Sequence, residues 1–451
     1  MPNLVFIYAI IFKFMERLLF SARAFSVVCA NLLIISVFFF TYYLFRPQRR
    51  TTRLLIASCS VLLLLANPLF SYTSGLAWSH DFPALVLMLA FFLQVYGARK
   101  GRTNVWIFLS GLLLGLAIGT RLTFLLASLA FGLSLAFYPG IPSKKARINL
   151  IISFIAGIFV GVLPTIILFL VSPEKFLFWN IHFVRLNTLY RQLTRYTGRM
   201  DLASKLEFLL IDIYGEPGNL LLLLSTIFFA FSTRFFVPIK DKYLRSQSNL
   251  ILLLILFLTI GGLVPTPSFH QYFYAPIPFA ILGCVYGLAS LYQYPIDHKR
   301  NWLLVLFVQI VILTNIFTFS DYPRLLNLKD PASWIPIQTH GIGKVIKAET
   351  VQGKVLTLAP IYPLEGNLSI YPELATGPFV WRAAHLIPIE QRREYGALSG
   401  DDIEDYLAEQ PPDGILTVGY EEELEEPLID YAQQNGYQQK KLSKDLWLWV
   451  P

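Results

Sequence analysis

Charged residues are scarce in this 451-residue sequence. They make up 15% of the chain, whereas soluble domains carry roughly 25%. The shortage is confined to one region, because residues 1–319 contain nine acidic and 26 basic side chains, while residues 320–451 contain 20 acidic and 11 basic ones. These counts exclude a single soluble domain and indicate two regions that face different solvents.

Cysteine is also rare. The three cysteines, Cys29, Cys59 and Cys284, all lie in apolar runs, which excludes a disulfide framework and indicates small core residues. We expect no signal peptide either, because the first 20 residues are apolar but contain interrupting charges and no small-residue cleavage site. We interpret residues 1–20 as a juxtamembrane amphipathic helix on the outer surface; the alternative is an eleventh span.

Residues 1–319 consist largely of long apolar runs. A transmembrane helix needs about 20 mostly apolar residues. Ten candidates cover residues 25–46, 53–71, 83–98, 104–119, 121–138, 148–171, 218–236, 249–265, 272–293 and 302–319. The sequence therefore predicts an all-α polytopic membrane domain over residues 1–319, in which the short pair 104–138 has the alternative of one re-entrant hairpin.

Basic residues cluster in alternate loops between these runs. Residues 46–53, 99–102, 144–147, 234–245 and 299–300 hold the clusters, whereas the short loops 72–82 and 266–271 have no lysine or arginine. Because basic loops stay in the cytoplasm, we expect loops 72–82, 172–217 and 266–271 and the tail to face outward. The same clustering explains the basic excess as membrane topology, so no nucleic-acid partner is expected.

The tail, residues 320–451, alternates between strand and helix signals. Strands are predicted in GKVLTLAP, PPDGILTVGY and DLWLWV, and helices in DDIEDYLAEQ and EELEEPLIDYAQQNGY. This order predicts a small soluble α/β domain outside the cytoplasm. We expect its acidic run, residues 421–426, to be a solvated helix face.

One candidate site lies at the outer start of the third span. There, His80 and Asp81 precede Phe82-Pro83, and Asp81 is the only acid of its loop. Asp81 could act as a helix N-cap, or as a carboxylate that binds a metal ion or positions a hydroxyl group. The two interpretations are compatible.

Three further outer segments contain candidate binding residues. His270, Tyr272 and Tyr274 start the ninth span, where an interfacial aromatic belt is the alternative. Arg121 needs a partner, such as a phosphate, unless it snorkels to the surface. In loop 172–217, His182 and Arg185 belong to a segment suited to the headgroup layer; they would bind a lipid-linked phosphate or pair with the acids of the loop.

The order of these features resembles a known family. Four stretches carry the resemblance: SARAFSVVCANLLIISVFFFTYYLFR with Arg23, NPLFSYTSGLAWSHDFPALVLMLAFFL with Asp81, WIFLSGLLLGLAIGTRLTFLL with Arg121, and HQYFYAPIPFAIL with His270 and Tyr274. They are similar to the GT-C fold of polyprenyl-phosphate-sugar-dependent glycosyltransferases, which include protein O-mannosyltransferases and the aminoarabinose transferase of lipid A. The bacterial members of uncharacterised acceptor are the most similar branch.

The resemblance implies transfer of a sugar from a polyprenyl phosphate to a lipid, glycan or protein acceptor outside the bacterial plasma membrane. It implies that a carboxylate activates the acceptor hydroxyl and that Arg, Lys or a divalent metal (Mg or Mn) stabilises the leaving phosphate. We therefore assign Asp81 as the catalytic and metal-binding candidate. The substrate-binding candidates are His80, Arg121, His182, Arg185, His270, Tyr272 and Tyr274.

One departure from the family affects this assignment. The principal catalytic Asp of the family lies in a first outer loop, and the sequence has no counterpart of that loop or of the span before it. We expect an N-terminal truncation, and activity if the loop is restored. The alternatives are a lipid or polysaccharide transporter, which would need polar groups at the midplane, and a non-catalytic scaffold.

Overall fold

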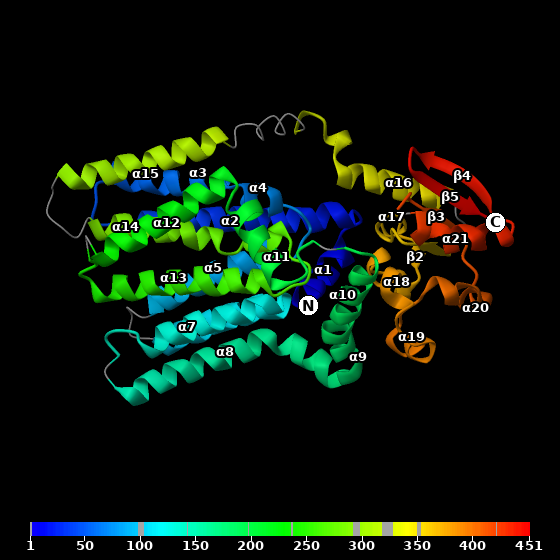
Figure 1. The fold of residues 1–451 in the computed structure, drawn as a ribbon, viewed down its shortest axis with the longest axis horizontal. Helices are drawn as coiled ribbons and strands as arrows, with labels where there is room; N and C mark the ends of the chain where they lie inside the picture. The colour runs from blue at the N-terminus through cyan, green and yellow to red at the C-terminus, as the bar shows by residue number, and fades with distance from the viewer. Residues whose placement is uncertain are drawn as a thin grey trace. The chain divides into compact units, whose positions relative to one another are not determined.

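The computed structural model of the protein describes residues 2–97, 103–141, 143–196, 198–235, 238–291, 298–317, 328–349, 353–420 and 422–451. The chain divides into two compact units (Figure 1). The first unit comprises residues 1–7, 23–170 and 198–323, and the second comprises residues 8–22, 171–197 and 324–451.

All the regular secondary structure in the described residues of the first unit is helical. The two units share α1 (Pro2–Phe14) and the start of α2 (Leu18–Leu44). The first unit continues with α3 (Arg50–Leu65), α4 (Pro68–Thr73), α5 (Asp81–Gly97), α6 (Thr103–Thr120), η1 (Leu122–Leu126), α7 (Ala127–Ala136), α8 (Lys144–Val171), α11 (Leu202–Glu207), η3 (Phe208–Ile213), α12 (Pro217–Phe235), α13 (Lys242–Leu263), η4 (His270–Phe273), α14 (Ile277–Leu291) and α15 (His298–Phe317).

Each of the ten apolar runs coincides with a helix or a pair of helices. Six helical segments are long and apolar enough to cross a membrane, and four shorter apolar helices accompany them. The predicted all-α polytopic domain is confirmed, and the protein is a multi-pass membrane protein. The pair over 104–138 forms α6 and the η1–α7 segment, which meet at Arg121. Helix α1 has 13 residues, a length of about 20 Å, so by itself it is shorter than the hydrocarbon core.

Small residues allow α6 and α8 to pack closely. Gly111 and Gly115 on α6 face Gly157 and Gly161 on α8, and a Cβ atom at Gly111 would lie 2.1 Å from the backbone oxygen of Phe154. Glycines spaced four residues apart permit such close contact between transmembrane helices. Helix α14 lies at the centre of the bundle, where α3, α12 and α13 contact it, and its side chains are almost all buried.

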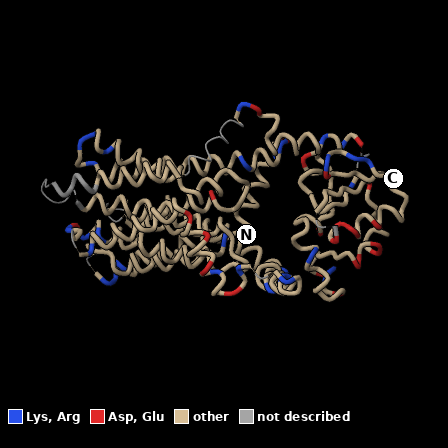
Figure 2. The backbone as a smooth tube through the Cα atoms, turned by 45° about the horizontal axis from the view of Figure 1, so that its top comes forward, with Lys and Arg blue, Asp and Glu red and all other residues tan. Residues whose placement is uncertain are grey.

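The two ends of the bundle differ in charge. Arg50, Lys144, Arg234 and Lys242 lie at one end, where α3, α8 and α13 begin and α12 ends, and lysines and arginines gather there in Figure 2. We call this the basic end. The opposite end, where α5 begins and α6 ends, contains Asp81 and is called the site end.

The second unit contains a five-stranded sheet. Its strands are β1 (Lys354–Thr357), β2 (Ser369–Ile370), β3 (Gly414–Thr417), β4 (Gln438–Ser443) and β5 (Leu446–Val450), in the order β2-β1-β3-β5-β4. The strands β1, β2 and β3 are parallel, and β5 is antiparallel to β3 and β4. The predicted strands correspond to β1, β3 and β5, and the small α/β fold is confirmed.

Helices of the second unit cover this sheet and extend from it. They are α9 (Pro173–Leu177), η2 (Phe178–His182), α10 (Phe183–Leu193), η6 (Pro331–Ser333), α16 (Ile335–Glu349), α17 (Ile361–Glu365), η7 (Pro372–Leu374), α18 (Pro378–Ala384), α19 (Ile389–Tyr395), η8 (Gly400–Asp402), α20 (Ile403–Glu409) and α21 (Glu422–Gln434). The two predicted helices correspond to α20 and α21.

The acidic run at the start of α21 is not entirely solvated, contrary to our expectation. The carboxylate of Glu425 is buried and accepts hydrogen bonds from the backbone N–H groups of Val418 and Gly419, at 2.9 Å each. Burial raises the pKa of Glu425, and these hydrogen bonds oppose the increase. Glu425 therefore ties α21 to the loop after β3.

Candidate functional site

Polar side chains from three distant segments meet at the site end of the first unit. They come from the loop between α4 and α5, from the turn between α6 and η1, and from η4 with the residues after it. The contacts below join His80, Asp81, Arg121, Tyr272 and Tyr274 into one cluster. The sequence predicted that these segments share one side of the membrane, and the structure adds that the side chains touch.

The carboxylate of Asp81 is almost completely buried, with 1% of the residue exposed. One oxygen accepts a hydrogen bond from the Tyr274 hydroxyl at 3.1 Å, and the other accepts one from the Gly75 backbone N–H at 2.9 Å. Gly75 has φ +77°, which favours glycine at this turn. Asp81 accepts no hydrogen bond from the first turn of α5, so the N-cap interpretation is wrong. Asp81 instead holds the loop against Tyr274.

His80 and Arg121 form the second contact of the cluster. A terminal nitrogen of the Arg121 guanidinium lies 2.5 Å from His80 Nε2 and 3.4 Å from Ser79 Oγ. Burial lowers the pKa of His80 well below its usual value, and the charge of Arg121 lowers this pKa further. His80 is therefore neutral, with Nε2 as the acceptor and the proton on Nδ1. The buried Nδ1 has no hydrogen-bond partner among the described residues.

The Arg121 guanidinium also lies over the ring of Tyr272, 4.8 Å from its centroid, and the Tyr272 ring stacks on His80 at 6.1 Å. No carboxylate in the described part of the chain lies within ion-pair distance of Arg121. Its partners are a neutral imidazole, a hydroxyl and an aromatic face, so it does not simply snorkel to the surface. The cluster thus contains a cation that no acid of the described residues neutralises.

The aromatic-belt interpretation fits neither tyrosine of the cluster. Tyr274 is 0% exposed, whereas belt residues sit at the interface with the headgroups, and Tyr272 contacts Arg121 and His80. His270 lies to one side, where its ring meets Tyr72 at 5.7 Å and Phe208 at 4.9 Å. These contacts place His270 beside the loop of Asp81, whose carboxylate accepts its hydrogen bonds from Gly75 and Tyr274.

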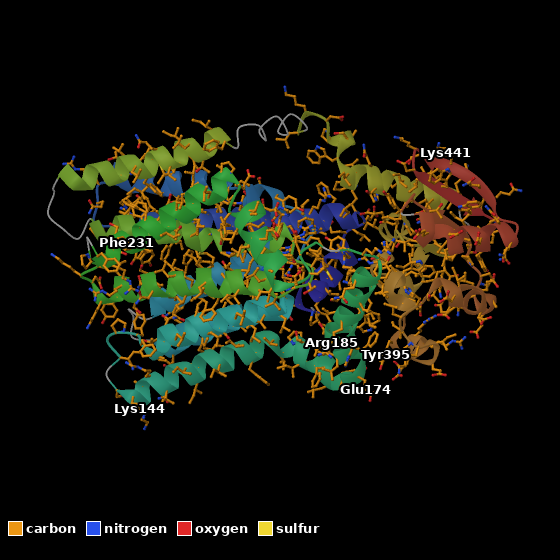
Figure 3. All side chains as sticks on the ribbon, in the orientation of Figure 1. Lys144, Glu174, Arg185, Phe231, Tyr395 and Lys441 are labelled. Atoms are coloured by element: carbon orange, nitrogen blue, oxygen red, sulfur yellow. The ribbon has the colours of Figure 1, made fainter. Side chains whose placement is uncertain are left out.

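His182 and Arg185 belong to the second unit, on η2 and α10, and both are exposed. Figure 3 labels Arg185 on its helix. Among the described residues neither forms an ion pair, so pairing with acids of the loop is not observed. The opposite face of this segment packs Phe178 and Phe183 against α18 and α19. Their role in binding lipid phosphate stays a prediction.

Sequence reasoning missed several residues of the site end. Lys205 is buried, and its ammonium donates hydrogen bonds to the Leu263 carbonyl at 3.0 Å and to Thr266 Oγ1 at 2.8 Å. This contact ties α11 to the end of α13 and positions the loop that leads to η4. Ser79 and Gln271 also escaped notice, because isolated polar residues in loops carry no pattern.

A small cavity of about 10 Å³ lies against this cluster, lined by His80, Arg121, Gln271 and Tyr272 among others. That volume is the space of about one water molecule. Gln271 Oε1, like His80 Nδ1, is buried without a partner among the described residues. Since buried polar atoms are normally hydrogen-bonded, these two atoms mark a place for a polar ligand.

The described residues do not fit a metal ion held by the chain alone. No group of three His, Cys, Asp or Glu side chains is assembled among them. Asp81 would supply one protein ligand, and Mg²⁺ is usually held by one or two carboxylates together with the phosphates of a substrate, so the site by itself does not decide the metal requirement. We therefore derive no step through a metal ion, and the metal requirement stays a prediction.

The fold and its site end define the class: a multi-pass membrane protein with a GT-C-like helical bundle and a small sheet-containing unit. Its structure is similar to ArnT from Cupriavidus metallidurans, which was solved bound to undecaprenyl phosphate. The TM-score is 0.57 at 13% sequence identity, and the match covers 95% of this chain and 84% of that one. No family model matches the sequence, and no curated protein matches it.

Proposed function

We propose that the protein is a membrane glycosyltransferase that takes a sugar from a polyprenyl phosphate and transfers it to an acceptor outside the cytoplasm. The observation that supports this most is that Arg121, which no acid of the described residues neutralises, and the buried carboxylate of Asp81 lie at the same end of a GT-C-like bundle. The similarity to a protein bound to undecaprenyl phosphate also supports a polyprenyl carrier as the ligand.

Arg121 and His80 suit the phosphate of the donor. The guanidinium is permanently charged and offers a planar set of N–H donors that matches phosphate oxygens. His80 adds an N–H at Nδ1 that has no partner in the described residues. Because the adjacent cavity measures about 10 Å³, a sugar phosphate does not fit there without movement. We expect binding to separate Tyr272 from Arg121.

In the proposed reaction, the acceptor hydroxyl oxygen attacks the anomeric carbon while Asp81 takes its proton. The bond between that carbon and the phosphate oxygen breaks, with inversion, and the electron pair leaves on the polyprenyl phosphate. Arg121 stabilises the negative charge that develops there. Tyr274 and Gly75 hold the Asp81 carboxylate in place through the two hydrogen bonds described above.

The test measures release of polyprenyl phosphate from a radiolabelled polyprenyl-phosphate sugar, a product common to every acceptor, in proteoliposomes that contain cell-envelope extract. Wild type is expected to release it, and Asp81→Asn to reduce the rate at least 100-fold, in the range of general-base effects. Asp212→Asn changes an exposed carboxylate of the same unit and is the matched control.

Equal rates for Asp81→Asn and wild type would remove Asp81 from the chemistry. Transport of the intact lipid across the bilayer without loss of sugar would replace the transferase proposal by the transporter alternative.

A further inference from the structure

A second cavity lies at the basic end, far along the bundle from the site. Its volume is about 1050 Å³, just above the range of about 300–1,000 Å³ that is typical of ligand pockets. Its walls come from α2, α5, α13 and α14, including the turn that follows α2. Nothing in the proposed transfer reaction uses this space.

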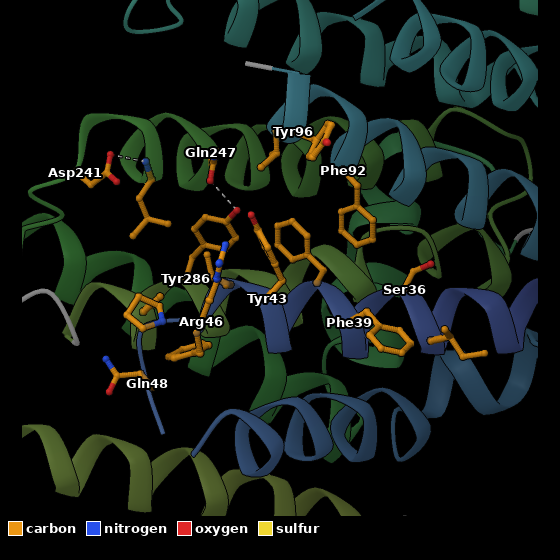
Figure 4. Close-up of a pocket in the computed structure, with 18 residues that line it drawn as sticks. Ser36, Phe39, Tyr43, Arg46, Gln48, Phe92, Tyr96, Asp241, Gln247 and Tyr286 are labelled. Carbon is orange, nitrogen blue, oxygen red and sulfur yellow. Dashed lines mark hydrogen bonds between the residues drawn. The ribbon is translucent and has the colours of Figure 1, made fainter. Parts of the chain in front are cut away.

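The lining of this cavity is polar at one end and apolar at the other. Figure 4 shows Arg46, Gln48 and Asp241 on one side of the view, and Phe39 and Phe92 on the other. The polar side corresponds to the end of α2 and the beginning of α13. A molecule that fills the cavity would thus place a polar group at the basic end and an apolar chain deeper in the bundle.

Two groups at the polar side lack partners among the described residues. The guanidinium of Arg46 extends into the cavity beside Tyr43 and Tyr286 (Figure 4), and no ion pair or side-chain hydrogen bond joins it. Gln247 is 1% exposed, and its Oε1 accepts a hydrogen bond from the Tyr286 hydroxyl at 2.9 Å. Its Nε2 is buried without a partner among the described residues, so this amide donor lacks an acceptor oxygen, and the exposed Arg46 supplies a cation to the same cavity.

The depth of the cavity matches one leaflet of a bilayer. Along α2 its lining extends from Ile35 to Leu44, which is about 14 Å at the rise of an α-helix. The hydrocarbon core of a membrane is about 30 Å thick, so the cavity covers about half of it. A fatty acyl chain has this reach, whereas a long polyprenyl chain extends well beyond it.

The charges of the lining favour a phosphate with a single negative charge. Among the described residues of the lining, Arg46 is the cation and Asp241 is the acid; the Asp241 carboxylate caps α13 by accepting from the N–H groups of Tyr243 and Leu244. A phosphate monoester carries about −1.5 to −2 at neutral pH and would be poorly balanced here. A phosphodiester carries one charge and fits the lining better.

We propose that this cavity binds a membrane phospholipid, with its phosphodiester at Arg46 and Gln247 and one acyl chain between Phe39 and Phe92. The site is distinct from the cluster around Asp81 and takes lipid from the leaflet at the basic end. The bound lipid fills the space between α2, α5 and α13 and is expected to stabilise the bundle there.

Native mass spectrometry of the full chain in mild detergent tests the proposal, with phosphatidylglycerol added as the probe. Wild type is expected to retain one phospholipid. Arg46→Ala should weaken retention about tenfold, the effect of losing one charge-assisted hydrogen bond. Arg49→Ala is the matched control, because Arg49 is an exposed arginine of the same loop that does not line the cavity, and it should behave as wild type.

Ser36→Trp provides a second variant that fills the apolar part of the cavity and leaves Arg46 in place; it should also lose the lipid. Equal retention by wild type and both variants would overturn the proposal, as would wild type that retains no phospholipid. Displacement of phosphatidylglycerol by an equal concentration of polyprenyl phosphate, dependent on Arg46, would overturn the choice of a phospholipid as the occupant.

Discussion

Replacing Arg121 by methionine should separate the function of this residue from its contribution to stability. The substitution removes the charge and keeps a long apolar side chain. It eliminates the hydrogen bonds to His80 and Ser79 and the contact with the Tyr272 ring. If Arg121 is a structural cation, the protein should unfold more easily; if it serves to bind phosphate, stability without ligand should hardly change.

The magnitudes support the second outcome. A hydrogen bond to a charged group contributes about 1.5–3 kcal/mol, and a cation–π contact contributes about 0.5–2 kcal/mol. Against this, a cation without a neutralising acid costs several kcal/mol to take out of water. The opposing contributions are of similar size, so we expect the free energy of unfolding of Arg121→Met to lie within about 1–2 kcal/mol of wild type.

Ligand binding should respond very differently. Losing one charge-assisted hydrogen bond to phosphate lowers affinity roughly 10- to 150-fold. At a polyprenyl phosphate concentration 100 times Kd, wild type gains about 2.7 kcal/mol, whereas a variant weakened 100-fold gains only about 0.4 kcal/mol. The assay is the thermal unfolding midpoint of the purified protein with and without polyprenyl phosphate. Arg195→Met, at an exposed arginine of the second unit, controls for total charge.

Two results would refute this reasoning. A collapse of the midpoint in Arg121→Met without ligand would make the residue a structural cation. An unchanged shift on adding polyprenyl phosphate would mean that the phosphate binds elsewhere.

Three further predictions concern the site, the fold and the topology. The pKa of His80 is lowered in the folded protein, so its contribution to the free energy of unfolding is fully present above about pH 6.5 and is lost below it, by up to about 1.4 kcal/mol per pH unit, until the folded pKa is reached. His80→Gln should therefore flatten the plot of the thermal unfolding midpoint against pH between about pH 6.5 and 5.5. An unchanged slope would contradict the neutral state of His80. Gly111→Leu should prevent folding, as a Cβ would meet a backbone oxygen of α8 at 2.1 Å, whereas Gly132→Leu, with open space around it, should fold normally in fluorescence-detected gel filtration. The native cysteines are buried, so a membrane-impermeant maleimide should react only with cysteines that are introduced at exposed positions. It should label Ser71→Cys at the site end in intact cells, and Thr51→Cys at the basic end only after the cells are permeabilised. The reverse pattern would invert the predicted topology.

The membrane helices were predictable from the sequence because each is a continuous apolar run between polar loops. Their arrangement was not. Helices that are apolar all round carry no signal of which face meets lipid and which meets protein, since lipid tails are as apolar as leucine. Thus nothing in the sequence marked α14 as the central helix, and the close contact at Gly111 and Gly115 was not predicted, although glycines spaced four residues apart are typical of it.

In the sheet-containing unit, the sequence predicted the strands that are rich in apolar residues and missed the polar or very short ones. The strands β3 and β5 are buried and read clearly as strands. Strand β4, with the sequence QQKKLS, is an almost fully exposed edge and has no alternating apolar pattern. Strand β2 has only two residues. The buried Glu425 was missed because its run of neighbours looks solvated.

The candidate site was predictable as a set of segments but not as a set of contacts. Charge alternation predicted that Asp81, Arg121 and Tyr274 share one side of the membrane. Asp81 and Tyr274 lie 193 residues apart in the chain, and no local pattern reports such a hydrogen bond. The segment with His182 and Arg185 belongs to the other unit, a division that sequence periodicity does not reveal.

The most direct test of the account is an experimental structure of the full chain with polyprenyl phosphate bound. We predict that the phosphate lies within hydrogen-bond distance of the Arg121 guanidinium and of His80 Nδ1, with Tyr272 moved off the arginine. A phosphate bound at Arg46 or anywhere else, with Arg121 still on His80 and Tyr272, would contradict the account.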